Sequence, residues 1–276
     1  MSDNIFFVPW WQIISGTIFN IRRARKNLIF EKIMPMKTIL LSVVALLFAV
    51  FSFGQTALPA YPSKSAESVT KFLEELNAIS DNLAVEIDKC NKANDAIGEK
   101  IDPSKMTAAY GMGQDVNALM ERQKRTMANV ELYNRIQALG DKYSKMKKEI
   151  LDRYEQDYAP FNEARINLIN HCIGEVGSNN NCDQLVADKN SKGDVILTKY
   201  YFGNGAELVG WLNAFISEVP PLSKQYMIEA MSLQEENIGV QFPHKADLAT
   251  MMEQKAIVDA MIDVFGLDMK LFNEIF

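Results

Sequence analysis

The sequence predicts an all-α protein, in which a long antiparallel coiled-coil helical hairpin is packed on, or joined to, a compact helical bundle. Apolar residues recur at spacings of three and four over two long stretches, 64–100 and 114–158, and this is the period of a helix. Only residues 195–202 have the composition of a strand. A lone strand has no partner with which to form a sheet, so we expect a helix there too.

Residues 36–54 resemble a bacterial secretory signal. A lysine gives them a positive start, the run Ile39–Phe53 is apolar, and small residues end the segment just before Gln55. The alternative is a membrane anchor, but this run has 15 residues, whereas a spanning helix needs roughly 20. We therefore expect cleavage before Gln55, an exported protein that is periplasmic or extracellular, and no membrane span in the mature chain.

Residues 1–35 precede a signal that is already complete from Met36. A translation start assigned too far upstream explains them most simply. The alternatives are an extended leader with a twin-arginine address at Arg22 and Arg23, or a segment that lies on a membrane surface. The hydrophobic core of the signal begins only at Ile39, well after the arginine pair, and this favours the first explanation.

The charge of the mature chain disfavours nucleic acid as a partner. Residues 1–54 hold six basic and two acidic side chains, so the net charge changes from −6 for the whole chain to −10 for residues 55–276. A chain with this charge repels phosphate backbones, and no run of lysine or arginine offers a local exception.

The first long stretch has a narrow apolar seam, which is typical of a helix that packs on another long helix. Residues 55–63 before it are a predicted linker, and Pro103, Gly111 and Gly113 break the pattern after it. The seam is our candidate surface for a protein partner or a second copy of the chain. Its residues recur at every seventh position: Val69, Leu76, Leu83, Cys90 and Ile97.

The second long stretch is predicted to pair with the first, so that residues 64–172 form the antiparallel hairpin. Pro160 is expected to kink or interrupt it. Residues 173–276 have shorter elements and are predicted to form the compact helical unit. In that unit Pro221 and Pro243 stand where prolines are tolerated before or within the first turn of a helix.

Two of the three cysteines are predicted to form a disulfide, because exported proteins fold where thiols oxidise. Cys172 and Cys182 flank nine residues of loop composition, which lets their Cα atoms approach to the distance that a disulfide needs. Cys90 is left over. It is interpreted as a small buried hydrophobe, and the alternative is an intermolecular bridge through the seam.

No cofactor and no metal ion are expected. His171 with the two paired cysteines gives only three zinc ligands, in a compartment that favours the disulfide. Residues 188–199 resemble an EF-hand calcium loop, but Lys192 and Lys199 stand where acidic ligands are needed. We therefore interpret Gly193, the turn glycine of that loop, as an ordinary helix-breaking turn.

The sequence favours a non-enzymatic protein that acts through protein contacts or self-association. It lacks the nucleophile-elbow, phosphate-loop and dinucleotide glycine motifs, although a catalytic site assembled from distant residues leaves no such motif. The alternative is a ligand-binding module that holds a glycan, a peptide or a small apolar ligand. Its candidate surface consists of four aromatic residues: Tyr200, Tyr201, Trp211 and Phe215.

Overall fold

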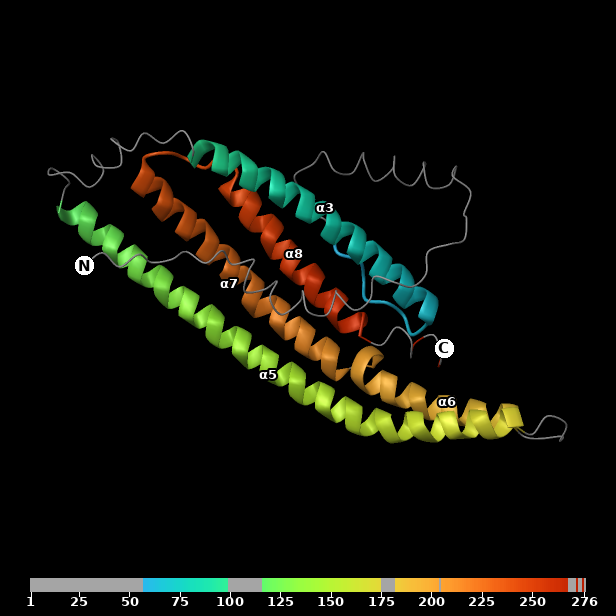
Figure 1. Cartoon of the computed structure of the whole chain (residues 1–276). Helices are drawn as coiled ribbons and strands as arrows, with labels where there is room; N and C mark the ends of the chain where they lie inside the picture. Colours follow the sequence, from blue (N-terminus) through green and yellow to red (C-terminus); the bar gives the residue numbers. More distant parts are fainter. Residues whose placement is uncertain are drawn as a thin grey trace, which may run out of the picture. The chain divides into compact units, whose positions relative to one another are not determined.

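The computed structural model describes residues 57–98, 116–174, 182–203, 205–267, 272 and 275, and no strand occurs among them. The all-α prediction is confirmed. The predicted leader, the predicted signal and the break between the two long stretches lie outside the described residues. The helices are α3 (Ala66–Gly98), α5 (Val116–Gly174), α6 (Cys182–Leu197), the π-helical turn η1 (Thr198–Phe202), α7 (Glu207–Ile238) and α8 (Lys245–Phe265) (Figure 1).

The four long helices pack side by side in the order α3, α8, α7, α5, and each runs antiparallel to its neighbour (Figure 1). α6 packs along the carboxyl-terminal part of α5 and leads through η1 into α7. The chain after residue 182 therefore returns along α5, first as α6 and then as α7.

The antiparallel coiled-coil hairpin predicted between the first two long stretches is not confirmed. α3 packs mainly on α8, whereas α5 packs mainly on α7 and α6. A sevenfold apolar pattern predicts that a helix packs on another helix, but it does not identify that helix. The principal partners of α5 are α6 and α7, which follow it in the sequence.

One hydrophobic core joins these helices. It contains Leu76 from α3, Tyr143 from α5, Leu212 from α7 and Val258 from α8, all of them buried. Burial of a large apolar side chain contributes about 1.5 to 3 kcal/mol, so a core shared in this way couples the helices. The described residues from Ala57 onward accordingly belong to one compact unit.

Among the described residues, three prolines lie inside helices. Pro160 does not interrupt α5, which continues to Gly174 and bends in its carboxyl-terminal part (Figure 1). The helix start predicted at Pro221 was wrong, because α7 runs without a break through Pro220 and Pro221. A proline in a helix removes one backbone hydrogen bond and costs about 3 kcal/mol. Pro220 is buried beside Val219, and burial of this kind offsets part of that cost.

The turn predicted at Gly193 was also wrong, because Gly193 lies within α6. Glycine is needed there for space. A Cβ atom at this position would lie 2.5 Å from Cζ of Phe161 and 2.6 Å from Cδ1 of Ile275. The glycine therefore lets α6 approach α5, at the expense of local helix propensity.

Substitution of Gly193 by alanine is expected to lower the free energy of unfolding by about 1 to 3 kcal/mol, because the new methyl group overpacks the contact with Phe161. Gly140→Ala is the matched control, since a Cβ atom there would meet no atom within 4 Å. It should stabilise the protein by about 1 kcal/mol through helix propensity. Urea unfolding measures both changes, and a stabilised Gly193→Ala variant would contradict the close approach.

Candidate functional site

The seam predicted for a partner helix lies against α8 of the same chain over most of its length. Val69 and Leu76 are fully buried, and Leu83 is buried as well, whereas Cys90 and Ile97 are only partly buried. Ser80, on the same side of α3, donates a 2.8 Å hydrogen bond to Oδ1 of Asp259 on α8. The first part of the seam is therefore not available to another protein.

The four aromatic residues predicted to form a ligand surface are mainly core residues. Tyr200, Tyr201 and Trp211 are buried, and Phe215 is partly buried and stacks on Trp211. The indole nitrogen of Trp211 donates a 2.7 Å hydrogen bond to the backbone carbonyl of Tyr143 on α5, which satisfies its polar atom. These residues join α5 to η1 and α7, and they offer no open aromatic surface.

The predicted cysteine pair is brought together. Cys172 at the end of α5 and Cys182 at the start of α6 have their Cα atoms 5.8 Å apart and their sulfurs at bonding distance. His171 beside them is exposed. Cys90 is a free thiol, and partial burial, followed by the charge of Asp247, raises its pKa. A raised pKa favours the protonated thiol, which is a poor nucleophile.

Among the residues that the structure describes, no group of three or more histidine, cysteine, aspartate or glutamate side chains is placed to hold a metal ion. No helix in the same residues combines the length and the apolar character needed to cross a membrane.

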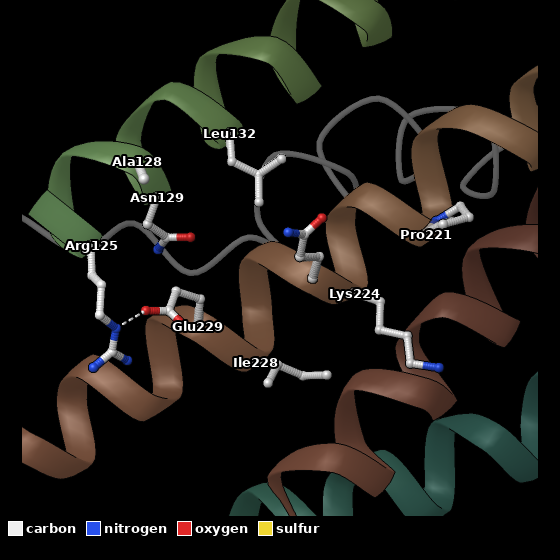
Figure 2. Close-up of a pocket in the computed structure, with 9 residues that line it drawn as sticks. Arg125, Ala128, Asn129, Leu132, Pro221, Lys224, Ile228 and Glu229 are labelled. Carbon is white, nitrogen blue, oxygen red and sulfur yellow. Dashed lines mark hydrogen bonds and ion pairs between the residues drawn. The ribbon is translucent and has the colours of Figure 1, made fainter.

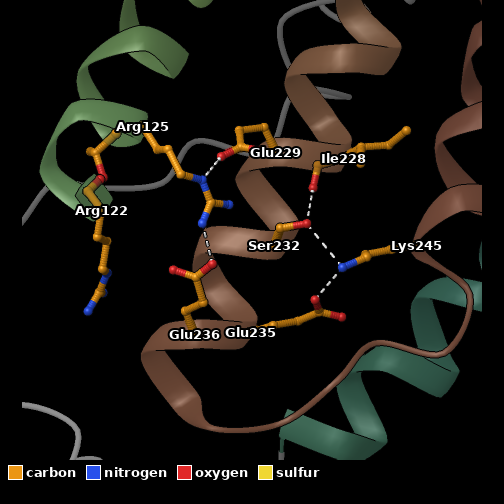
Figure 3. Close-up of polar contacts among 9 residues, drawn as sticks. Arg122, Arg125, Ile228, Glu229, Ser232, Glu235, Glu236 and Lys245 are labelled. Atoms are coloured by element: carbon orange, nitrogen blue, oxygen red, sulfur yellow. Dashed lines mark hydrogen bonds and ion pairs between the residues drawn. The ribbon is translucent and has the colours of Figure 1, made fainter. Parts of the chain in front are cut away.

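The sequence reasoning missed the amino-terminal part of α5, which has two distinct faces. On its inner face Arg125 bridges two carboxylates of α7 (Figure 3). Its Nε donates to Oε1 of Glu229 at 2.7 Å, and its Nη1 donates to Oε1 of Glu236 at 2.5 Å. These hydrogen bonds raise the pKa of Arg125, and the one to Glu229 contributes most. We call this group the Arg125 clamp.

A second polar group holds the turn from α7 to α8 (Figure 3). Glu235 accepts a hydrogen bond of 2.6 Å from the backbone N–H of Phe242 and another from Lys245. Lys245 also donates to Oγ of Ser232 at 3.0 Å. The end of α7 is thereby attached to α8 on one side and, through the Arg125 clamp, to α5 on the other.

A cleft of about 530 Å³ lies between α5 and α7 beside the clamp (Figure 2). Both cations that line it are already paired: Arg125 as described, and Lys224 with Glu253 on α8 at 2.9 Å. Asn129 is buried in its wall, and its Oδ1 atom has no hydrogen-bond partner among the described residues. The rest of the lining is Ala128, Leu132, Pro221, Gln225 and Ile228.

The outer face of the same part of α5 carries exposed apolar side chains, which we call the α5 stripe. Each member is between 52 and 69% exposed. At 100° per residue, all of them fall within an arc of about 100° on the side of the helix away from Arg125 and Asn129. The members are Val116, Leu119, Met120, Met127 and Val130.

The α5 stripe has a signal in the sequence that was overlooked. The apolar spacing from Leu132 to Ile150 marks the inner face of α5. A second apolar set, starting at Val116, lies on the opposite face of the same helix. A helix that is apolar on two faces predicts two packing partners.

Comparison of the chain with protein-family models, with curated proteins and with solved structures gives no match. The function proposed below therefore rests on the geometry of α5 and its neighbours.

Loss of the disulfide is expected to lower the free energy of unfolding by about 3 kcal/mol, because the bond restricts the unfolded chain. The Cys172→Ala, Cys182→Ala double variant and the reduced wild-type protein should unfold at similar, lower temperatures. A reductant should lower the unfolding temperature of Cys90→Ala by as much as it lowers that of the wild type. An unfolding temperature of the wild type that a reductant leaves unchanged would contradict the bond.

Proposed function

We propose that this chain is an exported, non-enzymatic helical protein, periplasmic or extracellular, that acts through protein contacts made by the α5 stripe. The observation that carries the proposal is the set of exposed apolar side chains on one face of α5. The signal-like residues 36–54 and the Cys172–Cys182 pair support export, since disulfides persist mainly in oxidising compartments.

The size of the α5 stripe supports a docking role. Its five side chains expose roughly 500 Å² together, which is the size of the largest apolar patch on a typical monomeric protein, and such a patch is often functional. Burial of that area gives a gross gain of about 12 kcal/mol, and association costs about 4 to 15 kcal/mol. The balance favours a reversible contact.

The shape of the α5 stripe favours a helix as the partner. Its members are spaced at three, four and seven residues along one helix face, which is the spacing that packs into the side-chain rows of a second helix. Lys124, Glu131 and Arg135 flank one side of it and are exposed. Because these charges are mixed in sign, a helix with a narrow apolar face fits better than a strongly charged one.

A second candidate function is the binding of a small neutral ligand, or of one side chain of a partner, in the cleft between α5 and α7. The unpaired Oδ1 of Asn129 supports it, because a buried amide oxygen without a partner costs about 1 to 3 kcal/mol. Since Arg125 and Lys224 are both paired, a group with an N–H or O–H donor fits the cleft better than an anion.

A photo-crosslinking amino acid at Met127 is expected to give a discrete protein adduct in the exporting cell, because this side chain would lie inside the contact. The same amino acid at Val195, which is 67% exposed on α6, should give none. Met120→Glu should remove the adduct, whereas Val85→Glu on α3 should not. Gels of whole cells measure these adducts, and no adduct from Met120, Met127 or Val130 would contradict the proposed function.

Asn129→Leu is expected to raise the free energy of unfolding by about 1 kcal/mol beyond the effect of Asn134→Leu, because it removes an unpaired buried oxygen. Asn134 is exposed on the same helix and calibrates the gain in helix propensity. Urea unfolding compares the two. Equal gains in stability for the two variants would argue against an unsatisfied amide at Asn129. A neutral ligand that stabilises the wild type but not Asn129→Leu would support ligand binding in the cleft.

A further inference from the structure

We propose that the partner of the α5 stripe is the α5 stripe of a second copy of this chain, packed antiparallel about a twofold axis at Gln123. The inference rests on the proposed function, because it takes the stripe as the docking surface. It adds the identity of the partner and the orientation of the contact.

The stripe is nearly symmetric about Gln123, which lies on the same exposed face. Val116 and Val130 are seven residues before and after it, and Leu119 and Met127 are four residues before and after it. In an antiparallel pair centred there, Val116 of each copy meets Val130 of the other, and Leu119 with Met120 meets Met127. A self-complementary patch of this kind forms a closed twofold dimer.

The polar residues that follow the stripe favour the antiparallel orientation. After Val130, the same face of α5 continues with Asn134, Asp141, Lys145 and Lys148. A parallel pair in register would place each lysine beside its own copy along the length of the helix, and like charges repel. The antiparallel pair overlaps only over the stripe, so these polar residues lie outside the contact.

The charges beside the axis are paired within each copy. Lys124 lies about 90° from the middle of the stripe and 3.9 Å from Glu121 of its own copy. Because equal flanks meet across an antiparallel contact, Lys124 of each copy lies near Lys124 of the other, and the neighbouring Glu121 offsets part of that repulsion. Exposed charges of this kind change the affinity by at most about 1 kcal/mol, so the apolar side chains supply the contact.

The contact area predicts a weak dimer. Two stripes together bury roughly 1,000 Å², which is below the roughly 1,200 to 2,000 Å² of stable specific interfaces and typical of weak, transient ones. We therefore expect a dissociation constant in the micromolar range. Met127 of each copy packs on Leu119 and Met120 of the other, so Met127→Glu places an unpaired carboxylate in each half of the apolar contact and should raise that constant at least tenfold.

Cysteine cross-linking of the full chain purified from the exporting cell tests the orientation. In a Cys90→Ser background, Gln123→Cys should form a disulfide-linked dimer under a mild oxidant. Val116→Cys and Val130→Cys should each cross-link poorly alone and efficiently when mixed. Val195→Cys is the control at an equally exposed site and should stay monomeric.

Three results would overturn the proposal in different ways. Efficient self-linking of Val116→Cys and of Val130→Cys, with no gain on mixing, would show a parallel pair. The protein could stay monomeric in analytical ultracentrifugation at 100 times the expected dissociation constant, while the cross-linker at Met127 gives an adduct with the mass of another protein. That result would exclude a second copy as the partner but keep the proposed function. A monomer without any adduct would overturn both. Unchanged thermal unfolding of Met127→Glu excludes misfolding as the cause.

Discussion

The length of α5 is the constraint on which the rest of the structure depends. A helix of 59 residues extends over about 88 Å, and no other described helix is long enough to cover it. The chain covers the inner face with two elements in series, α6 and α7. It fixes them at three levels: by the Cys172–Cys182 pair, by the hydrogen bond from Trp211 to the carbonyl of Tyr143, and by the Arg125 clamp. No described element covers the outer face at the start of α5 in this way, and the apolar side chains there are exposed.

The turn η1 allows two helices to follow one partner. Tyr200 and Tyr201 are adjacent in sequence, yet both are buried against Tyr154 of α5, with ring centroids 5.1 and 5.8 Å away. A π-helical turn accommodates an extra residue and so alters which side chains face inward. Gly205, with a φ of 83°, then takes a conformation that costs other residues more. Asp157 accepts hydrogen bonds from Lys199 and from the hydroxyl of Tyr200, and these lower its pKa. The junction is thus held by both apolar and polar contacts.

Local patterns in the sequence predicted local structure, and long-range partners were beyond them. The period of the apolar residues predicted the helices, and the spacing of Cys172 and Cys182 predicted that these two cysteines pair. Both features depend on residues that are close in the sequence. The partner of α3 depends on contacts such as Ser80 with Asp259, 179 residues apart, which leave no local pattern. Pro221 and Gly193 misled because packing overrides propensity at both positions. The Arg125 clamp joins residues that are 104 and 111 positions apart, so it leaves no local pattern either. The α5 stripe, in contrast, could have been predicted from a helical wheel.

The position of the Arg125 clamp divides α5 into two parts with different cooperativity. All residues from Val116 to Glu121 are exposed, so these turns gain little from burial and depend on local helix formation, which is marginal for a short segment. The helix beyond Arg125 shares the core and unfolds with it. The free energy needed to unfold the amino-terminal end of α5 is therefore lower than that needed to unfold the rest of the molecule. A partner that binds there has to order these turns, so completing the helix offsets part of the binding energy. The affinity then depends on helix propensity even at positions that the partner does not contact.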